Sequence, residues 1–164
     1  MANAQQLDLP QGPNKRLAAP DGSQILYGVR SSNAPQLWID DRRAHRRIKL
    51  FDIGGTLSAA WSPDGSAFYV NDHWASDREC AYVYDAATLK RMDIAAMIQA
   101  ADPQSRRFAA GHAYYEIERW VGSQHVAVRF FGHTDVPPVS IFEFSYAISR
   151  DGAVEKAGQR ISRH

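Results

Sequence analysis

The stretch that decides the fold reads Ala60-Trp61-Ser62-Pro63-Asp64-Gly65-Ser66-Ala67-Phe68-Tyr69-Val70. Its centre, residues 62–65, is a turn signal, because proline presets its own backbone angle and glycine accepts a positive φ. Short runs of aromatic and apolar residues flank the turn, which is typical of two antiparallel strands joined by a tight hairpin. We therefore predict strands over residues 57–61 and 67–71.

The same turn occurs earlier in the chain. Ala19-Pro20-Asp21-Gly22-Ser23 repeats it, and the two Asp-Gly pairs lie 43 residues apart. Each copy begins a unit of four short β-rich segments, at residues 15–53 and 57–92. A third unit at residues 113–162 also has four predicted strands, although its first turn, Gly122-Ser123, contains no proline. The sequence thus predicts an all-β fold of about twelve antiparallel strands in three four-stranded meander sheets.

One segment departs from the β pattern. Residues 93–101 show helical spacing, with Asp93 as a possible cap and Pro103 as a stop. The apolar positions of this segment are Ile94, Met97, Ile98 and Ala101. We predict one short inserted helix, which covers an exposed side of the sheets.

The two turns and the segments after them resemble a known repeat. Ser62-Pro63-Asp64-Gly65, with Tyr82-Val83-Tyr84-Asp85 downstream, is similar to the TolB-like, WD-like β-propeller repeat, in which this turn joins the first two strands of a blade. The first unit, with Leu37-Trp38-Ile39-Asp40, resembles a second copy. The resemblance implies blades and no particular activity, because these residues serve turn geometry and packing.

Three blades are fewer than a closed propeller contains. They would leave apolar sheet faces and strand edges uncovered. We expect a partial propeller-like stack in which the helix at 93–101 covers one side. Two chains that pair as a homodimer are the alternative solution.

Composition argues against several classes of protein. Lysine and arginine number 19 and aspartate and glutamate 18, so the formal charge of +1 gives no general attraction for nucleic acid or an anionic membrane. No apolar run reaches the roughly 18 residues of a membrane-spanning helix. Cys80 is the single cysteine, so neither an intramolecular disulfide nor a cysteine-based zinc site can form.

The first residues suggest export. Met1-Ala2-Asn3-Ala4-Gln5-Gln6 is similar to the end of an Ala-x-Ala secretory cleavage site behind an initiator methionine. We therefore expect a periplasmic or exported protein, with the cytoplasm as the alternative because the charged and apolar parts of a signal are absent. Residues 1–14 are polar and without periodicity, so they are expected to form a flexible lead-in to a single β domain at 15–164.

The connections between the second and third strands of each unit should emerge on one side. These connections are the segments 30–33, 72–78 and 132–135. Side chains there that could bind a partner are Asp72, His73, Trp74, Asp77, Arg78, His133 and Asp135. Histidines and carboxylates could also bind zinc or perform acid–base catalysis, but their sequence spacing matches no metal motif, and solvated loops are normally polar. A tryptophan among charges suggests a binding hot spot, unless its ring folds back onto the sheet.

A basic hairpin joins the third and fourth strands of the first unit. It contains Arg42, Arg43, His45, Arg46, Arg47 and Lys49. Such a run can contact phosphates or an acidic protein groove. Alternatively, the charges protect an edge strand from aggregation, with Asp40-Asp41 neutralising part of the run.

Signatures of catalysis are absent from the sequence. It contains no Gly-x-Ser-x-Gly elbow, no βαβ alternation, and no glycine-rich phosphate loop before a helix, so we expect no enzyme, cofactor or metal. In size and architecture the chain resembles inhibitors, including bacterial immunity proteins that block toxins. We expect a non-catalytic module that binds a toxin or enzyme through the 72–78 loop. The alternatives are a scaffold that binds an acidic partner through residues 42–49, and a metal-dependent hydrolase that uses His73 and His133.

Overall fold

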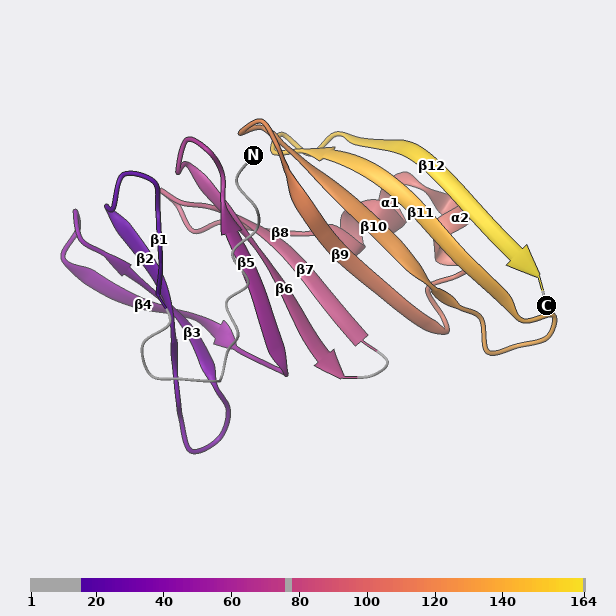
Figure 1. Ribbon diagram of the computed structural model, residues 1–164, viewed down its shortest axis with the longest axis horizontal. Helices are drawn as coiled ribbons and strands as arrows, with labels where there is room; N and C mark the ends of the chain where they lie inside the picture. Colours follow the sequence, from indigo (N-terminus) through magenta and orange to yellow (C-terminus); the bar gives the residue numbers. More distant parts are fainter. Residues whose placement is uncertain (1–15, 76–77, 164) are drawn as a thin grey trace.

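A computed structural model describes residues 16–75 and 78–163, and Figure 1 shows a row of strands with two short helices. The predicted lead-in at 1–14 lies outside the described residues. The strands are β1 (Arg16–Ala18), β2 (Gln24–Val29), β3 (Gln36–Asp41), β4 (Arg46–Asp52), β5 (Thr56–Trp61), β6 (Ala67–Ala75), β7 (Arg78–Asp85), β8 (Arg91–Asp93), β9 (His112–Val121), β10 (His125–His133), β11 (Ser140–Ser149) and β12 (Val154–Arg163). The helices are α1 (Ile94–Ala101) and α2 (Pro103–Arg106).

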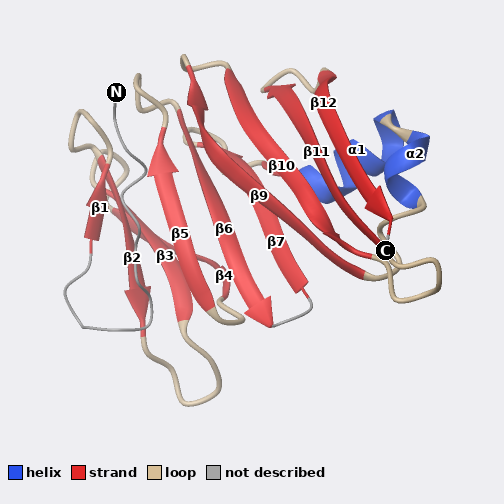
Figure 2. Ribbon diagram, turned by 45° about the vertical axis from the view of Figure 1, so that its right-hand side comes forward, coloured by secondary structure: helices blue, strands red, loops and turns tan. Residues whose placement is uncertain are grey.

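The strands form three successive antiparallel meanders, β1–β4, β5–β8 and β9–β12. The predicted all-β, partial propeller-like fold is therefore confirmed. One connection was not anticipated: β7 pairs in parallel with β9 through Arg78↔Ala113 and Glu79↔Tyr114, so the second and third meanders share one eight-stranded sheet. Both strands begin at the same end of the sheet, and Figure 2 shows them side by side.

The two Pro-Asp-Gly turns have the backbone that the sequence predicts. Gly22 and Gly65 have φ angles of 69° and 70°. In the second turn Asp64 accepts hydrogen bonds from the backbone and hydroxyl of Ser66 and from the hydroxyl of Ser62. These hydrogen bonds, with those from Ser66 the strongest influence, lower the pKa of Asp64 to about 2.

The second meander lies between two hydrophobic cores. Phe68 and Val70 face the first meander, whereas Tyr69 and Val83 belong to a core shared with the third meander and α1. Successive strand residues point to opposite faces, so a strand buried on both faces reads as a continuous apolar run. Burial of β6 in one core on each of its faces explains why residues 67–70 are apolar without alternation.

The predicted helix is present. Asp93 is the N-cap of α1 and accepts a hydrogen bond from the backbone N–H of Ala96, while Ile94 and Ile98 are fully buried. The second helix was missed, because Pro103 was interpreted only as a stop. Proline also suits the first turn of a helix, where no N–H donor is required, and here it begins α2. Neither helix is long and apolar enough to cross a membrane.

A buried asparagine links the second and third meanders. Asn71 on β6 is 2% exposed, and its amide donates to the carbonyl of Ile117 and accepts from the N–H of Ile117, both at 2.9 Å. Nearby, the indole of Trp120 donates to the carbonyl of Ala60 at 3.1 Å. Since β7 and β9 share only two register pairs, side-chain bonds supply much of the polar contact across this junction.

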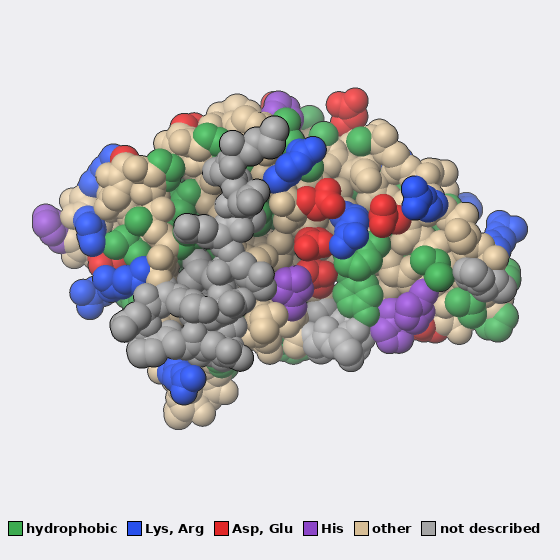
Figure 3. Space-filling view, in the orientation of Figure 1, with side chains coloured by type: hydrophobic (Ala, Val, Ile, Leu, Met, Phe, Trp, Pro, Cys, Tyr) green, Lys and Arg blue, Asp and Glu red, His purple; other side chains and the backbone are tan. Residues whose placement is uncertain are grey.

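The outward face of the third meander carries a charged cluster at its centre, whereas the sequence predicted an uncovered apolar face. Arg129 on β10 pairs with Glu116 at 2.8 Å and Glu143 at 3.8 Å, and its guanidinium lies over the ring of Phe131. Figure 3 shows acidic and basic side chains on the central part of this view. A charged face needs no neighbouring blade to cover it.

Candidate functional site

One end of the eight-stranded sheet gathers most of the predicted site residues. We call this end the rim and define it by His73, Trp74, His112, His133, Asp135, Val136 and Ile141. The registers Ala75↔Arg78, Arg78↔Ala113, His133↔His112 and His133↔Ile141 bring the ends of β6, β7, β9, β10 and β11 together there. Figure 3 shows histidine and hydrophobic side chains along the lower part of this view.

Two strands extend further toward the rim than the sequence analysis expected. β6 runs to Ala75 and β10 runs to His133, so Asp72, His73, Trp74 and His133 are strand residues and the loop assignment was wrong. Both segments are rich in polar residues, a composition that is typical of loops and that led to this assignment. The ladder continues because each segment keeps a partner strand, as in the pairs His73↔Glu79 and His133↔His112.

Asp72 does not line the rim as a partner-binding residue. Its side chain is buried, and its carboxylate accepts hydrogen bonds from the backbone N–H groups of Gly54 and Gly55, the shortest at 3.0 Å. Burial raises the pKa of Asp72, although these hydrogen bonds oppose the shift. Asp72 therefore holds the connection between β4 and β5, and its role is structural.

His73 forms a half-buried ion pair with a residue that sequence reasoning did not single out. Its Nδ1 lies 2.6 Å from Oε1 of Glu79, whose side chain is 5% exposed. The contact with the Glu79 carboxylate raises the pKa of His73 above its usual 6.5. The imidazole is therefore a partner for an otherwise buried charge.

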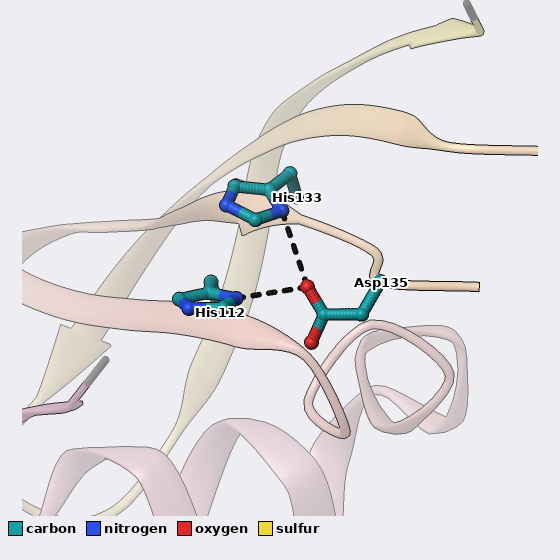
Figure 4. A group of neighbouring side chains, drawn as sticks. All are labelled: His112, His133 and Asp135. Atoms are coloured by element: carbon teal, nitrogen blue, oxygen red, sulfur yellow. Dashed lines mark hydrogen bonds and ion pairs between the residues drawn. The ribbon is translucent and has the colours of Figure 1, made fainter. Parts of the chain in front are cut away.

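A cluster of three side chains occupies the other part of the rim. His112 and His133 face each other across β9 and β10, with ring centroids 4.5 Å apart. Oδ1 of Asp135 lies 2.8 Å from Nδ1 of His112 and 3.4 Å from Nδ1 of His133 (Figure 4). The predicted pair His133 and Asp135 is brought together, and His112 completes the group. Within the described residues these three are the group whose ligand atoms lie close enough to hold a metal ion, and His73 is outside it.

His112 was missed because it precedes a predicted strand and is 21 residues from His133 in sequence. Strand pairing alone makes the two neighbours. A signal did exist: both histidines stand at the outer ends of strands predicted to form one hairpin, where hairpin register aligns opposite residues.

Hydrophobic side chains at the rim are unusually exposed. Trp74 is 53% exposed, Val136 75% and Ile141 52%. Trp74 also packs: a Cβ at Gly54 would fall 0.9 Å from Cδ1 of Trp74, so the indole lies directly on this glycine. The tryptophan therefore packs on the connection between β4 and β5, and 53% of its surface stays exposed to solvent.

A hollow opens beside the histidine cluster, between β7, β9 and the segment that follows α2. It has a volume of about 540 Å³, and its lining includes Glu79, Asp93, His112, Tyr115 and Asp135. Three of the twelve lining residues carry a carboxylate, and none is a lysine or an arginine. The hollow is therefore a region of negative charge next to the rim.

The remaining predicted residues have different outcomes. Asp77 lies outside the described residues, and of Arg78 only the backbone is described. In Figures 1 and 2 the loop that contains 30–33 projects from the same end of the molecule, beyond the separate sheet of the first meander. The three predicted segments thus share one end but form a row instead of a compact cluster.

The basic hairpin carries its own counter-charges. Arg43 pairs with Asp21, Arg46 with Asp41, Arg47 with Asp40 and Lys49 with Asp52. Its side chains, including the exposed Arg42, border β4, which is the edge strand of the first sheet. Charge at a sheet edge discourages strand addition, so this arrangement favours edge protection. Partner binding by Arg42, Arg43, Arg46 and Arg47 stays a prediction.

Comparisons with known proteins support the fold. No family model and no curated protein sequence matches the chain. Among solved structures, the β-propeller domain of the Trilobed protease from Pyrococcus furiosus, described as having an open velcro topology, is similar at 15% identity and a TM-score of 0.57, over 88% of this chain and 43% of that one.

Two TolB structures are also similar. TolB from Acinetobacter baumannii has 13% identity and a TM-score of 0.39 over 91% of this chain and 42% of its own. A TolB from Agrobacterium tumefaciens has 14% identity and a TM-score of 0.42 over 90% and 49%. The chain spans less than half the length of each of the three structures.

Proposed function

We propose that this chain is a non-catalytic protein-binding module whose rim contacts a partner protein. The exposed apolar side chains at the rim carry this proposal. Trp74, Val136 and Ile141 are each more than half exposed, and they come from different strands or loops at one end of the sheet. Large side chains of this kind supply the central anchors of protein interfaces.

The support beneath Trp74 strengthens the proposal. Its indole is held against Gly54, so the exposed face is presented in a fixed position. A side chain that is already ordered loses less conformational entropy when it binds. Charged and polar groups, His73 and Asp135 among them, lie at the same end of the sheet as the apolar anchors and could form the polar border of an interface.

We further propose that the partner is an enzyme or toxin and that binding inhibits it, as in an immunity protein. A small domain that displays a rigid tryptophan at one end is suited to enter a concave site. We also propose that the chain acts in the periplasm or outside the cell.

The test begins with capture from a bacterial lysate on three immobilised proteins: the wild type, Trp74→Ala, and Arg43→Ala as a control in the basic hairpin. We expect a partner that the Trp74 variant loses and the Arg43 variant keeps. With the identified partner purified, Trp74→Ala should weaken binding by roughly 30-fold, which corresponds to a hot spot of about 2 kcal/mol.

Three results would oppose the proposal or part of it. Equal affinity of the wild type and Trp74→Ala would remove the rim as the binding surface. Loss of binding in Arg43→Ala alone would instead support the scaffold alternative, in which the basic hairpin binds an acidic partner. If the bound partner kept its full activity, the inhibition hypothesis would be rejected and only the binding role would stand.

A further inference from the structure

We propose that His112, His133 and Asp135 form a binding site for a divalent transition-metal ion of the Zn²⁺ class, with an open coordination position at the rim. The inference is independent of the protein-binding role. It rests on the donor atoms, on the backbone that positions them, and on the charge around them.

The donor set suits zinc. Two imidazole nitrogens and one carboxylate oxygen are ligands that Zn²⁺ prefers, and sites with three protein ligands leave a fourth position for water or another group. The three ligand atoms lie within 4.8 Å of one another, and the two Nδ1–Oδ1 distances are 2.8 and 3.4 Å. Ligands in a tetrahedron with bonds of about 2 Å are separated by roughly 3.3 Å. Small side-chain rotations would therefore admit an ion.

The orientation of the rings points to a common target. Both imidazoles direct Nδ1 toward the same oxygen of Asp135, as Figure 4 shows. Without an ion, Oδ1 of Asp135 is the shared partner of two ring nitrogens. The three side chains are 40–50% exposed, and ion pairs at such exposed positions contribute little stability. A cation between the three groups would use all three donors at once.

The backbone holds the ligands from two strands and one loop. His112 and His133 are a directly opposed pair on β9 and β10. Gly132 permits this close approach, since a Cβ there would lie 1.8 Å from the carbonyl oxygen of His112. The loop with Asp135 is closed at its base, because Thr134 and Ser140 exchange hydrogen bonds through the Thr134 N–H and the Ser140 N–H. Ligands on paired strands are held more precisely than ligands on a free loop.

The surroundings favour a cation over an anion. The adjoining hollow is lined by Asp93 in addition to Asp135, and by Glu79, whose carboxylate is paired with His73. Carboxylates grouped in a concave region raise the local concentration of cations. The half-exposed ligands leave a path from solvent, so the ion can enter without local unfolding.

The test uses the full chain, freed of metal by dialysis against a chelator and titrated with ZnCl₂ by calorimetry. We expect one Zn²⁺ per chain. We expect at least about 100-fold weaker Zn²⁺ binding in each of three variants, His112→Ala, His133→Ala and Asp135→Asn. Loss of a group that only hydrogen-bonds to a metal ligand already weakens binding by about 10- to 100-fold, so loss of a ligand itself should cost at least as much. His125→Ala is the matched control, because this exposed histidine lies at the other end of the same strand, β10, and it should bind as the wild type does.

A second measurement does not depend on the stability of a variant. Co²⁺ added to the wild type should give the intense visible absorption of a four-coordinate site, which Zn²⁺ then displaces. Asp135→Asn, a change at a half-exposed loop residue, should lose this absorption while its circular dichroism stays that of the wild type. Absence of Zn²⁺ binding, or binding that survives in all three site variants, would overturn the proposal.

Discussion

The hydrogen bonds between the Asn71 side chain and the backbone of Ile117, which join the second and third meanders, offer a sharp test of the fold. We consider Asn71→Leu, which keeps a side chain of similar size but removes both polar atoms. In the wild type Asn71 satisfies the N–H and the carbonyl of Ile117, a residue that is 1% exposed. Leucine would fill the space and keep water from replacing the amide.

The size of the effect follows from these two backbone groups. Each buried polar group left without a partner costs about 1 to 3 kcal/mol. Part of this cost is offset by the apolar surface that leucine buries. We expect Asn71→Leu to lower the free energy of unfolding by about 3 kcal/mol. Ser58→Ala is the matched control, because it removes only the bond from Asn71 to the Ser58 hydroxyl at 3.2 Å, and it should cost about 1 kcal/mol or less.

The assay is urea denaturation followed by circular dichroism, together with hydrogen exchange at the amide of Ile117. We expect the exchange of this amide to accelerate in Asn71→Leu more than that of amides in the first meander. A loss of stability below about 1 kcal/mol, or an unchanged exchange rate at Ile117, would refute the claim that Asn71 joins the two meanders.

Three further predictions concern the rim and the turn that defines the repeat. Gly55→Ala places a Cβ 1.9 Å from the carbonyl oxygen of His73, so the backbone must shift. We expect the free energy of unfolding, measured by urea denaturation, to fall by about 3 kcal/mol. Gly158→Ala is the control, because the space around Gly158 is open, and it should change the free energy of unfolding by less than about 0.5 kcal/mol. Because Glu79 raises the pKa of His73, the stability that the pair contributes is complete below the unfolded value of 6.5 and is lost as the pH rises through the folded value. The difference in stability between the wild type and His73→Ala should therefore be larger at about pH 6 than at about pH 9, and a difference independent of pH would contradict this. The pKa of Asp64 is lowered to about 2, so the stability that its carboxylate contributes is present above pH 3.8 and is lost as the pH falls toward about 2. Asp64→Asn should therefore lose less stability than the wild type over this pH range, as measured by circular dichroism.

The repeat and its strands could be predicted from the sequence because turn chemistry is local. A proline and a glycine at residues 63 and 65 specify a backbone whatever the rest of the chain does. The cap of α1 at Asp93 is local in the same way and was also predicted correctly.

The way the meanders join could not be predicted. The contact between β7 and β9 depends on two register pairs and on Asn71, a polar residue that looks like the end of a strand until Ile117 is placed beside it. Pairing between distant segments leaves little trace in a single sequence, because its cause is tertiary.

The candidate site was predicted in part for the same reason. Polar residues near 72–78 and 132–135 were recognised as a group by their position in the repeat. The difference between Asp72, which is buried against Gly54, and Asp135, which is half exposed, depends on which face of the strand or loop each occupies. His112 could have been found by extending the predicted hairpin of β9 and β10 to its outer ends, where the register pairs it with His133.

We propose that the rim is the surface through which this molecule acts. The most direct test is hydrogen–deuterium exchange of the chain, free and bound to its captured partner. We expect slower exchange in the complex at residues 73–75 and 133–141, with no change at the 42–47 hairpin. Slower exchange confined to the hairpin, or to the outward face around Arg129, would contradict it.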